Sequence, residues 1–269
     1  MDENYLRYLK LLNLQYEKPG IEYLEKIVRA VMLKVPFENI SKLYYLKKYG
    51  LVGIPVLTQY LNGIEQHHFG GTCYSNNYYL NGLLVSLGFD AVLCGADMQM
   101  PDVHIVNRVK IEGREFIVDA GYAAPFLIPL PADLKTNFEI LSGNDKYILH
   151  PKDSAGRMKM ELFREGILTH GYIMKPEPRT IDNFNKAIKN SFSKDAIFMN
   201  SLLAVHFKED NTIIISNKNI IEMSKQSIIK KPIKDFEELL NEIERIFKIP
   251  TSISRIALKN ITMHKDAWG

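Results

Sequence analysis

The sequence contains few cysteines and no long hydrophobic run. Its two cysteines, Cys73 and Cys94, are too few for a disulfide framework and are expected to be free thiols in a reducing compartment. No uninterrupted apolar run is long enough to cross a bilayer. The opening segment, MDENYLRYLK, is polar and lacks the apolar part of a signal peptide. We therefore predict a cytoplasmic protein without a membrane partner.

The sequence also lacks a strong excess of charge of either sign. Its formal net charge is +3 over 269 residues, whereas proteins that bind nucleic acid usually concentrate basic residues on one face. The densest basic run, from Lys225 to Lys234, is interrupted by isoleucines and a proline, which favours a solvated strand edge or loop. We expect no nucleic-acid partner.

Metal-binding patterns are missing as well. His67 and His68 are adjacent, so they cannot point to one side of a helix as a zinc-binding pair four residues apart would. Adding His150, His170 and His206 gives no ligand spacing. We expect no metal site.

The hydrophobic pattern of the first third of the chain is helical. In residues 21–35 apolar residues recur at helical spacing and form one stripe, and Pro36 ends the segment. Residues 55–62 form a shorter candidate helix. A third begins near Cys73 and is closed by Gly88.

After Gly88 the pattern changes to short strands. Residues 104–111 and 114–120 are separated by Glu112 and Gly113, a hairpin turn signal. Further strand-like segments are residues 89–98, 147–151, 158–164 and 167–174. Their close spacing is typical of a small antiparallel barrel or curled sheet.

The last part of the chain mixes both patterns. Residues 181–192 form a helix or linker, and an amphipathic helix covers residues 235–249, with Asp235 as its cap and Glu238 completing a capping box. Strand-like segments are residues 200–207, 212–216 and 220–224.

The order of these patterns predicts an α+β fold of three domains. They are an N-terminal helical bundle (residues 1–88), a central antiparallel β-barrel with a linker helix (residues 89–190) and a C-terminal α/β lid (residues 191–269).

Cys73 stands where a reactive thiol would be expected. A thiol is a good nucleophile as its thiolate, which a helix N-terminus and a nearby imidazolium both favour. Gly70 and Gly71 allow the chain to turn just before the predicted helix. Cys94, inside a strand-like apolar run, is expected to be inert packing.

A base and a group that orients it are available on the predicted hairpin. His104 begins one strand and Asp119 ends the next, so adjacent antiparallel strands could bring the two side chains together. A cysteine, a histidine and an aspartate in a chain of this length can also be ordinary structural residues without a catalytic role. In that reading Cys73 is buried, His104 lies at the edge of the core and Asp119 is a solvated turn residue.

Four separated pieces of the sequence resemble the arylamine N-acetyltransferase family. They are VPFENI (residues 35–40), GGTCYSNN followed by LLVSLGF (residues 70–77 and 83–89), HIVNRVKIEGREFIVDAGY (residues 104–122), and the weaker pair FSKDAIFMNSLLAVHF and IFKIP (residues 192–207 and 246–250). The resemblance implies a cysteine-protease-like core whose triad falls on Cys73, His104 and Asp119. It also implies that Phe37 and Tyr122 line an acceptor pocket, with ordinary core packing as the alternative for each.

The same resemblance implies an activity. Acetyl-CoA would acetylate Cys73, CoA would leave, and an arylamine, arylhydrazine or hydroxylamine would take the acetyl group in a ping-pong mechanism. Backbone N–H groups near Cys73 would stabilise the developing oxyanion. The expected partners are therefore acetyl-CoA and a small amine, without a metal.

The sequence departs from the family pattern at two positions. Phe69 replaces the arginine that precedes the two glycines, and Ser75 replaces the usual Glu or Gln. Glu38, which matches the arginine's partner, is then expected either to be solvated or to have another donor.

These departures leave open an atypical acyl donor or acceptor, or weak activity, and two other functions are alternatives. The same triad could serve a thiol acyl hydrolase or an amide synthase. The chain could also be a catalytically weak homologue that only binds CoA.

Overall fold

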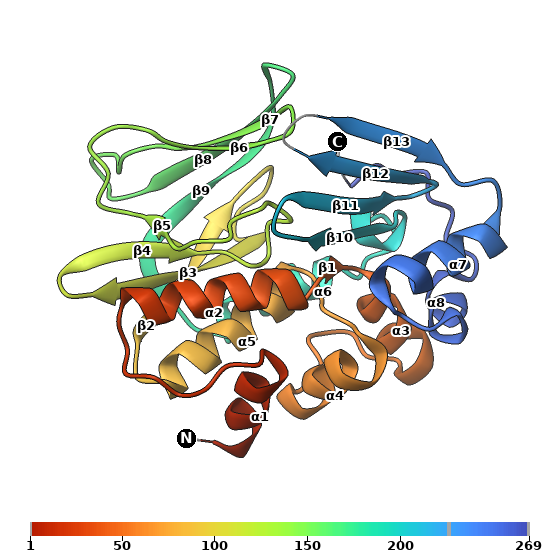
Figure 1. Cartoon of the computed structure of the whole chain (residues 1–269), viewed down its shortest axis with the longest axis horizontal. Helices are drawn as coiled ribbons and strands as arrows, with labels where there is room; N and C mark the ends of the chain where they lie inside the picture. Colours follow the sequence, from red (N-terminus) through yellow and green to blue (C-terminus); the bar gives the residue numbers. More distant parts are fainter. Residues whose placement is uncertain (1, 225–226, 268–269) are drawn as a thin grey trace.

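The structure, a computed structural model, describes residues 2–224 and 227–267. Five helices pack together at one side of the molecule, and two antiparallel sheets lie beyond them (Figure 1). The helices are α1 (Glu3–Leu11), α2 (Ile21–Lys34), α3 (Ile40–Tyr49), α4 (Leu57–His67) and α5 (Cys73–Ser86).

The apolar stripe predicted for residues 21–35 explains the position of α2. Its buried side chains are Tyr23, Leu24, Ile27, Val28, Val31 and Met32. They recur at intervals of three and four residues, so one face of the helix turns to the core. Cys73 is the first residue of α5, and Gly88 follows that helix with a φ of +91° that suits glycine.

The larger sheet is the predicted barrel. It curls into a near-closed barrel of eight antiparallel strands in the order β5-β4-β3-β2-β9-β8-β7-β6 (Figure 1). The strands are β2 (Asp90–Asp97), β3 (His104–Ile111), β4 (Arg114–Val118), β5 (Leu130–Pro131), β6 (Phe138–Ser142), β7 (Asp145–Leu149), β8 (Met158–Arg164) and β9 (Ile167–Arg179).

The hairpin of β3 and β4 has the register that its turn predicts. Ile111 pairs with Arg114, so Glu112 and Gly113 form a two-residue turn. Both have positive φ, +50° and +80°, as a tight hairpin with the right-handed twist of its strands requires. This register fixes where His104 and Asp119 lie.

The smaller sheet joins distant parts of the sequence. Its order is β1-β10-β11-β12-β13, so β1 (Phe37–Glu38), which lies between two helices in the sequence, pairs with β10. The other strands are β10 (Leu203–Phe207), β11 (Asn211–Ser216), β12 (Asn219–Ser224) and β13 (Ile228–Pro232). Helices α7 (Phe236–Phe247) and α8 (Thr251–Leu258) pack beside it.

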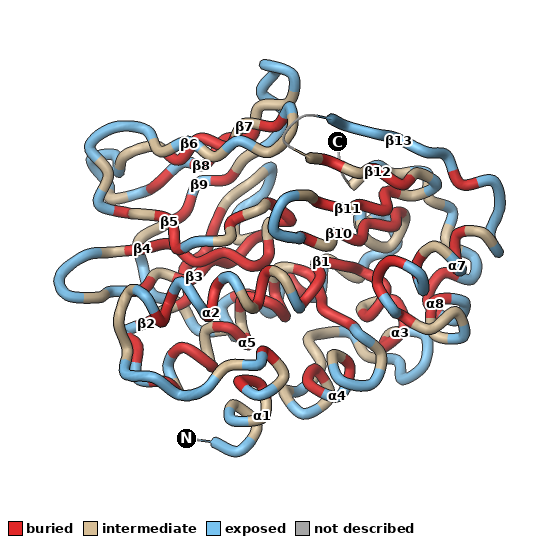
Figure 2. The backbone as a smooth tube through the Cα atoms, in the orientation of Figure 1, coloured by how far each residue is buried: buried red, intermediate tan, exposed pale blue. Residues whose placement is uncertain are grey.

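The structure tests two predictions for the C-terminal part of the chain, the solvated basic run and the cap of α7. Strand β13 is exposed along its length at the sheet edge, which confirms the solvated edge expected for the basic run, although residues 225–226 lie outside the described residues (Figure 2). Asp235 caps α7 by accepting from the Glu238 N–H at 2.9 Å. In the predicted capping box the Glu238 carboxylate would accept from the Asp235 N–H. It accepts instead from the N–H of Lys234, one residue earlier, at 2.6 Å.

The linker between the sheets is short and mostly helical. It comprises the 3₁₀ turns η1 (Ile181–Phe184) and η2 (Ile197–Met199) on either side of α6 (Asn185–Asn190). The predicted α+β order of helices, barrel, and C-terminal sheet with helices is confirmed, whereas the three domain boundaries stay a prediction. Within the described residues no helix is both long enough and apolar enough to span a membrane.

Candidate active site

The turn before α5 places Cys73 at the helix N-terminus. A Cβ atom on Gly70 would lie 1.8 Å from the Pro36 carbonyl oxygen, and one on Gly71 would lie 2.0 Å from Ser75 Oγ. The two glycines are therefore required because other chain atoms approach closely. The Glu38 N–H donates to the Gly71 carbonyl at 3.0 Å, which ties β1 to this turn.

His104 and Asp119 meet at the end of the hairpin. His104 Nε2 lies 2.8 Å from Asp119 Oδ2, and both side chains are almost wholly buried. Cys73 is partly exposed, with its Sγ 4.0 Å from the Val103 carbonyl oxygen, next to His104. A Cβ on Gly121 would lie 2.5 Å from the Cys73 Cα, so the segment after Asp119 packs directly on the start of α5. The structure brings the three predicted triad residues to one place.

Asn77, which the sequence reasoning missed, holds Asp119 in position. Its Nδ2 donates to Asp119 Oδ1 at 2.8 Å and to the Ile105 carbonyl at 2.6 Å, and its Oδ1 accepts from the Ala120 N–H at 2.8 Å. The Gly121 N–H donates to the same Asp119 oxygen at 2.9 Å. Asn77 follows Cys73 by four residues, so one face of α5 presents both. That spacing is the signal that could have identified it.

The His104–Asp119 pair is stable in its charged form. Burial disfavours an imidazolium, but the charge and hydrogen bond of Asp119, with smaller effects from Cys73, outweigh it and raise the pKa of His104. Burial also disfavours the carboxylate, but the His104 charge and the hydrogen bonds from His104, Asn77 and Gly121 lower the pKa of Asp119. Because Asp119 holds Nε2, the other ring nitrogen of His104, Nδ1, is left for Cys73.

The two aromatic residues suggested for the acceptor pocket lie in different surroundings. Tyr122 lies beside His104, with a ring separation of 5.8 Å, and its hydroxyl is 2.7 Å from His170 Nδ1. Phe37 is buried in the main core, with its ring 5.8 Å from that of Phe198. Their role in substrate binding stays a prediction.

Cys94 lies away from this constellation. It is fully buried in the core of the barrel, where burial raises the pKa of its thiol to about 11. This is the environment of an inert packing cysteine.

Backbone groups replace the family's arginine as the partner of Glu38. Glu38 is fully buried, and its carboxylate accepts from the Ser41 N–H at 2.7 Å and the Gly70 N–H at 3.1 Å. Burial raises its pKa, although these hydrogen bonds oppose the effect. Phe69 is also buried and packs its ring against those of Tyr44 and Tyr45. Of the two possibilities for Glu38, the structure has the substitute donor.

Replacing Glu38 by glutamine is expected to destabilise the protein by about 1–3 kcal/mol. Glutamine offers one acceptor oxygen where the carboxylate offers two, so one of the buried N–H groups of Ser41 and Gly70 loses its partner. Urea unfolding measures the difference, with Glu25→Gln on the exposed side of α2 as the control. A change below about 0.5 kcal/mol, the usual limit for surface substitutions, would show that Glu38 is not a buried hydrogen-bonded group.

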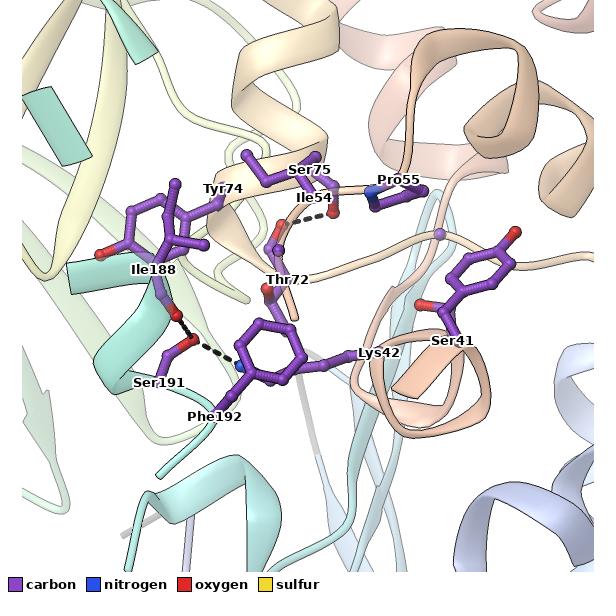
Figure 3. A pocket seen from close by; sticks show the side chains of 13 residues that line it. Ser41, Lys42, Ile54, Pro55, Thr72, Tyr74, Ser75, Ile188, Ser191 and Phe192 are labelled. Carbon is purple, nitrogen blue, oxygen red and sulfur yellow. Dashed lines mark hydrogen bonds between the residues drawn. The ribbon is translucent and has the colours of Figure 1, made fainter. Parts of the chain in front are cut away.

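A small pocket lies beside the start of α5 (Figure 3). Its walls come from α3, the loop at residues 53–55, the residues on either side of Cys73, and the segment at the end of α6. Its volume is about 30 Å³, enough for the centres of one or two water molecules. Lys42 is the charged residue among those that line it.

Comparison with known proteins identifies the family to which the chain is similar. The profile of the N-acetyltransferase family matches residues 20–256. The chain is 28% identical over 139 residues to the pineal gland arylamine N-acetyltransferase isozyme NAT-3 of Gallus gallus, covering 49% of this chain and 44% of that protein. It is 30% identical over 141 residues to the N-malonyltransferase FDB2 of Fusarium pseudograminearum, covering 46% of this chain and 40% of that protein. Both alignments span less than half the length of these relatives.

The fold agrees with this result. The structure of Mycobacterium marinum arylamine N-acetyltransferase in complex with CoA matches with a TM-score of 0.79, over 96% of this chain and 99% of that one, at 17% sequence identity. The profile match confirms the family resemblance of the sequence. Because the family profile covers most of its length, the chain belongs to the arylamine N-acetyltransferase family.

Proposed function

We propose that the protein transfers an acetyl group from acetyl-CoA, through a thioester on Cys73, to an arylamine, arylhydrazine or hydroxylamine. Membership of the family supports an acyltransferase that uses an acyl-CoA. The observation that carries the proposal is the buried His104–Asp119 pair beside a cysteine at a helix N-terminus. In this proposal Cys73 is the nucleophile, His104 the acid and base, and Asp119 the residue that orients and stabilises the imidazolium.

In the first half-reaction the Cys73 thiolate attacks the thioester carbonyl of acetyl-CoA. The tetrahedral intermediate collapses, the acetyl group stays on Cys73, and CoA leaves as a thiolate that takes the Nδ1 proton of His104. The first backbone N–H groups of α5 have no acceptor within the helix and are suited to bind the oxyanion. Negative charge near this N-terminus is also favoured by the helix dipole.

In the second half-reaction the amine attacks the acetyl-Cys73 thioester. Neutral His104 Nδ1 takes the proton of the attacking nitrogen, and Cys73 leaves as a thiolate beside the imidazolium that has formed. The charge of Asp119, 2.8 Å from His104 Nε2, stabilises that imidazolium in both half-reactions. A thioester keeps the acyl group reactive enough for the two steps to share one site.

Intact-protein mass spectrometry after mixing with acetyl-CoA tests the proposal. We expect a mass increase of one acetyl group on Cys73 that an arylamine removes. An adduct that decays equally fast without amine would indicate the hydrolase, and no adduct would indicate the homologue that only binds CoA. Because one relative is named an N-malonyltransferase, malonyl-CoA is tested beside acetyl-CoA.

Alkylation by iodoacetamide is expected to be fast at mildly acidic pH and selective for Cys73 over Cys94. The persistent imidazolium of His104 favours a thiolate beside it, whereas Cys94 is buried and its thiol pKa is raised. Peptide mapping after a short reaction at pH values between about 5 and 7 measures both rates, since free thiols are mostly protonated there. Equal, slow alkylation of the two cysteines would refute activation of Cys73.

A further inference from the structure

Lys42 is the unusual residue in the pocket beside Cys73. It is the third residue of α3, and its side chain is partly buried with its end between Ser191 and Phe192 (Figure 3). Its Nζ donates to Ser191 Oγ at 2.6 Å and lies 3.9 Å from the centre of the Phe192 ring. The pocket walls include Thr72 and Tyr74, the neighbours of Cys73 in the sequence.

The ammonium group of Lys42 is not paired with a carboxylate of the described residues. In the described part of the chain no carboxylate lies within 4.0 Å of its Nζ. By contrast, Lys175 contacts both Asp97 at 2.7 Å and Asp102 at 3.0 Å. A lysine ammonium has three N–H donors, and at Lys42 one of them is assigned to a neutral hydroxyl.

The charge of Lys42 nevertheless persists at neutral pH. Burial lowers the pKa of Lys42 to about 8, and the negative charge of Cys73 opposes the shift. Keeping a cation in such surroundings costs free energy, which an anion bound beside it would recover. A neutral side chain of the same length would pack against Phe192 without that cost.

The size of the pocket limits what that anion can be. Its volume of about 30 Å³ holds the centres of one or two water molecules, and a small terminal group such as a carboxylate fits such a space. Thr72 and Tyr74 flank Cys73 in the sequence, and the charge of Cys73 acts on the Lys42 ammonium, so the pocket lies near the nucleophile. The acyl group on the nucleophile is therefore a better occupant than the amine.

We propose that Lys42 binds the terminal carboxylate of a short dicarboxylic acyl chain, such as malonyl, when that chain is carried by CoA and then by Cys73. This assignment rests on the proposed acyl transfer through Cys73 and makes a dicarboxylic acyl-CoA, rather than acetyl-CoA, the preferred donor. In the acylation step the Cys73 thiolate forms the new thioester bond, the bond from the acyl carbon to CoA sulfur breaks, and CoA leaves as a thiol with the His104 proton. The carboxylate takes no part in the bond changes and only pairs with the Lys42 ammonium.

The test compares acylation of Cys73 by malonyl-CoA and acetyl-CoA in the full-length protein. We expect the wild-type protein to prefer malonyl-CoA, and Lys42→Met to lower the malonyl-to-acetyl ratio of rate constants by about 30-fold or more, as expected for the loss of a buried charge pair. Lys48→Met, which changes an exposed lysine on the same helix, should leave the ratio unchanged. A melting curve of each variant checks that the fold is retained.

Three outcomes would overturn the proposal. Equal preference for the two donors in the wild-type protein, or an unchanged ratio in Lys42→Met, would mean that Lys42 only ties α3 to the segment after α6. A Lys42→Met variant that is slowed only in discharge by 4-aminobenzoate, relative to a neutral arylamine, would assign the carboxylate to the acceptor.

A second measurement separates this proposal from acyl transfer itself. Iodoacetate and iodoacetamide alkylate Cys73 without CoA, and only iodoacetate carries a carboxylate. Lys42→Met should lower the iodoacetate-to-iodoacetamide ratio of rates, whereas Lys48→Met should not. A lowered ratio without any acyl-CoA adduct would refute the proposed function and retain the anion site. An acyl-CoA adduct with both ratios unchanged would retain the function and refute the site.

Discussion

Replacing Cys73 by serine is expected to lower acyl transfer by several orders of magnitude while the fold survives. A serine hydroxyl is far less acidic than a thiol, so His104 cannot ionise it in the ground state. Residues that act as one catalytic unit lose most of their combined effect when one is removed. The partly exposed position of Cys73 at the first residue of α5 accommodates the smaller oxygen without a change in packing.

Single-turnover acetylation followed by mass measures the effect, and a thermal melt checks the fold. Cys94→Ser is the matched control: it should keep activity but lose stability, because it puts a hydroxyl into the fully buried core of the barrel. Near-normal transfer by Cys73→Ser would end the assignment of Cys73 as nucleophile.

The part of the site on the β3–β4 hairpin could be predicted because its geometry is local. The turn residues Glu112 and Gly113 fix the register, and the register fixes the distance between His104 and Asp119. The position of Cys73 was equally local, since the glycines before it and the helical pattern after it mark a helix start. These signals lie within a few residues of the side chains that they place.

The rest of the site depends on contacts between distant segments. The pairing of Phe37 with Val205 brings β1 into the C-terminal sheet, and no pattern around Phe37 indicates a strand. The contact of Lys42 with Ser191 spans 149 residues. The sequence leaves two possibilities for Glu38, solvation or another donor, and cannot choose between them, because the donors are backbone N–H groups that every residue except proline carries.

Replacing Asp119 by asparagine is expected to slow acetylation of Cys73 by about 10⁴-fold, the loss seen when a triad carboxylate becomes an amide. Asn77 and the Gly121 N–H both donate to Asp119 Oδ1, so an asparagine would place its oxygen there. Its NH₂ group would then face His104 Nε2 and donate to it. That nitrogen would have to accept, the ring proton would move to Nδ1, and neutral His104 could not take a proton from Cys73.

The same substitution has a defined effect on stability as pH changes. The pKa of His104 is raised from 6.5 in the folded protein, so its stabilising effect is complete below 6.5 and is lost as pH rises through the folded value. The pKa of Asp119 is lowered from 3.8, so its effect is complete above 3.8 and is lost as pH falls through the folded value. The difference in unfolding free energy between wild type and Asp119→Asn should therefore be largest between pH 3.8 and pH 6.5, and it should shrink as the pH rises above 6.5.

Acetylation rates test the loss of activity, and urea unfolding from below pH 3.8 to above pH 6.5 tests the pH dependence of the stability difference. Asp133→Asn is the control, because Asp133 is an exposed carboxylate that pairs with Arg114 on the same hairpin and lies outside the site. It should leave the acetylation rate unchanged and should show no stability difference that shrinks above pH 6.5. A slow Asp119→Asn enzyme whose stability difference does not vary with pH would mean that Asp119 holds the backbone of the site rather than the charge of His104. Retained activity would mean that His104 keeps its tautomer without the carboxylate, and the role assigned to Asp119 would be wrong.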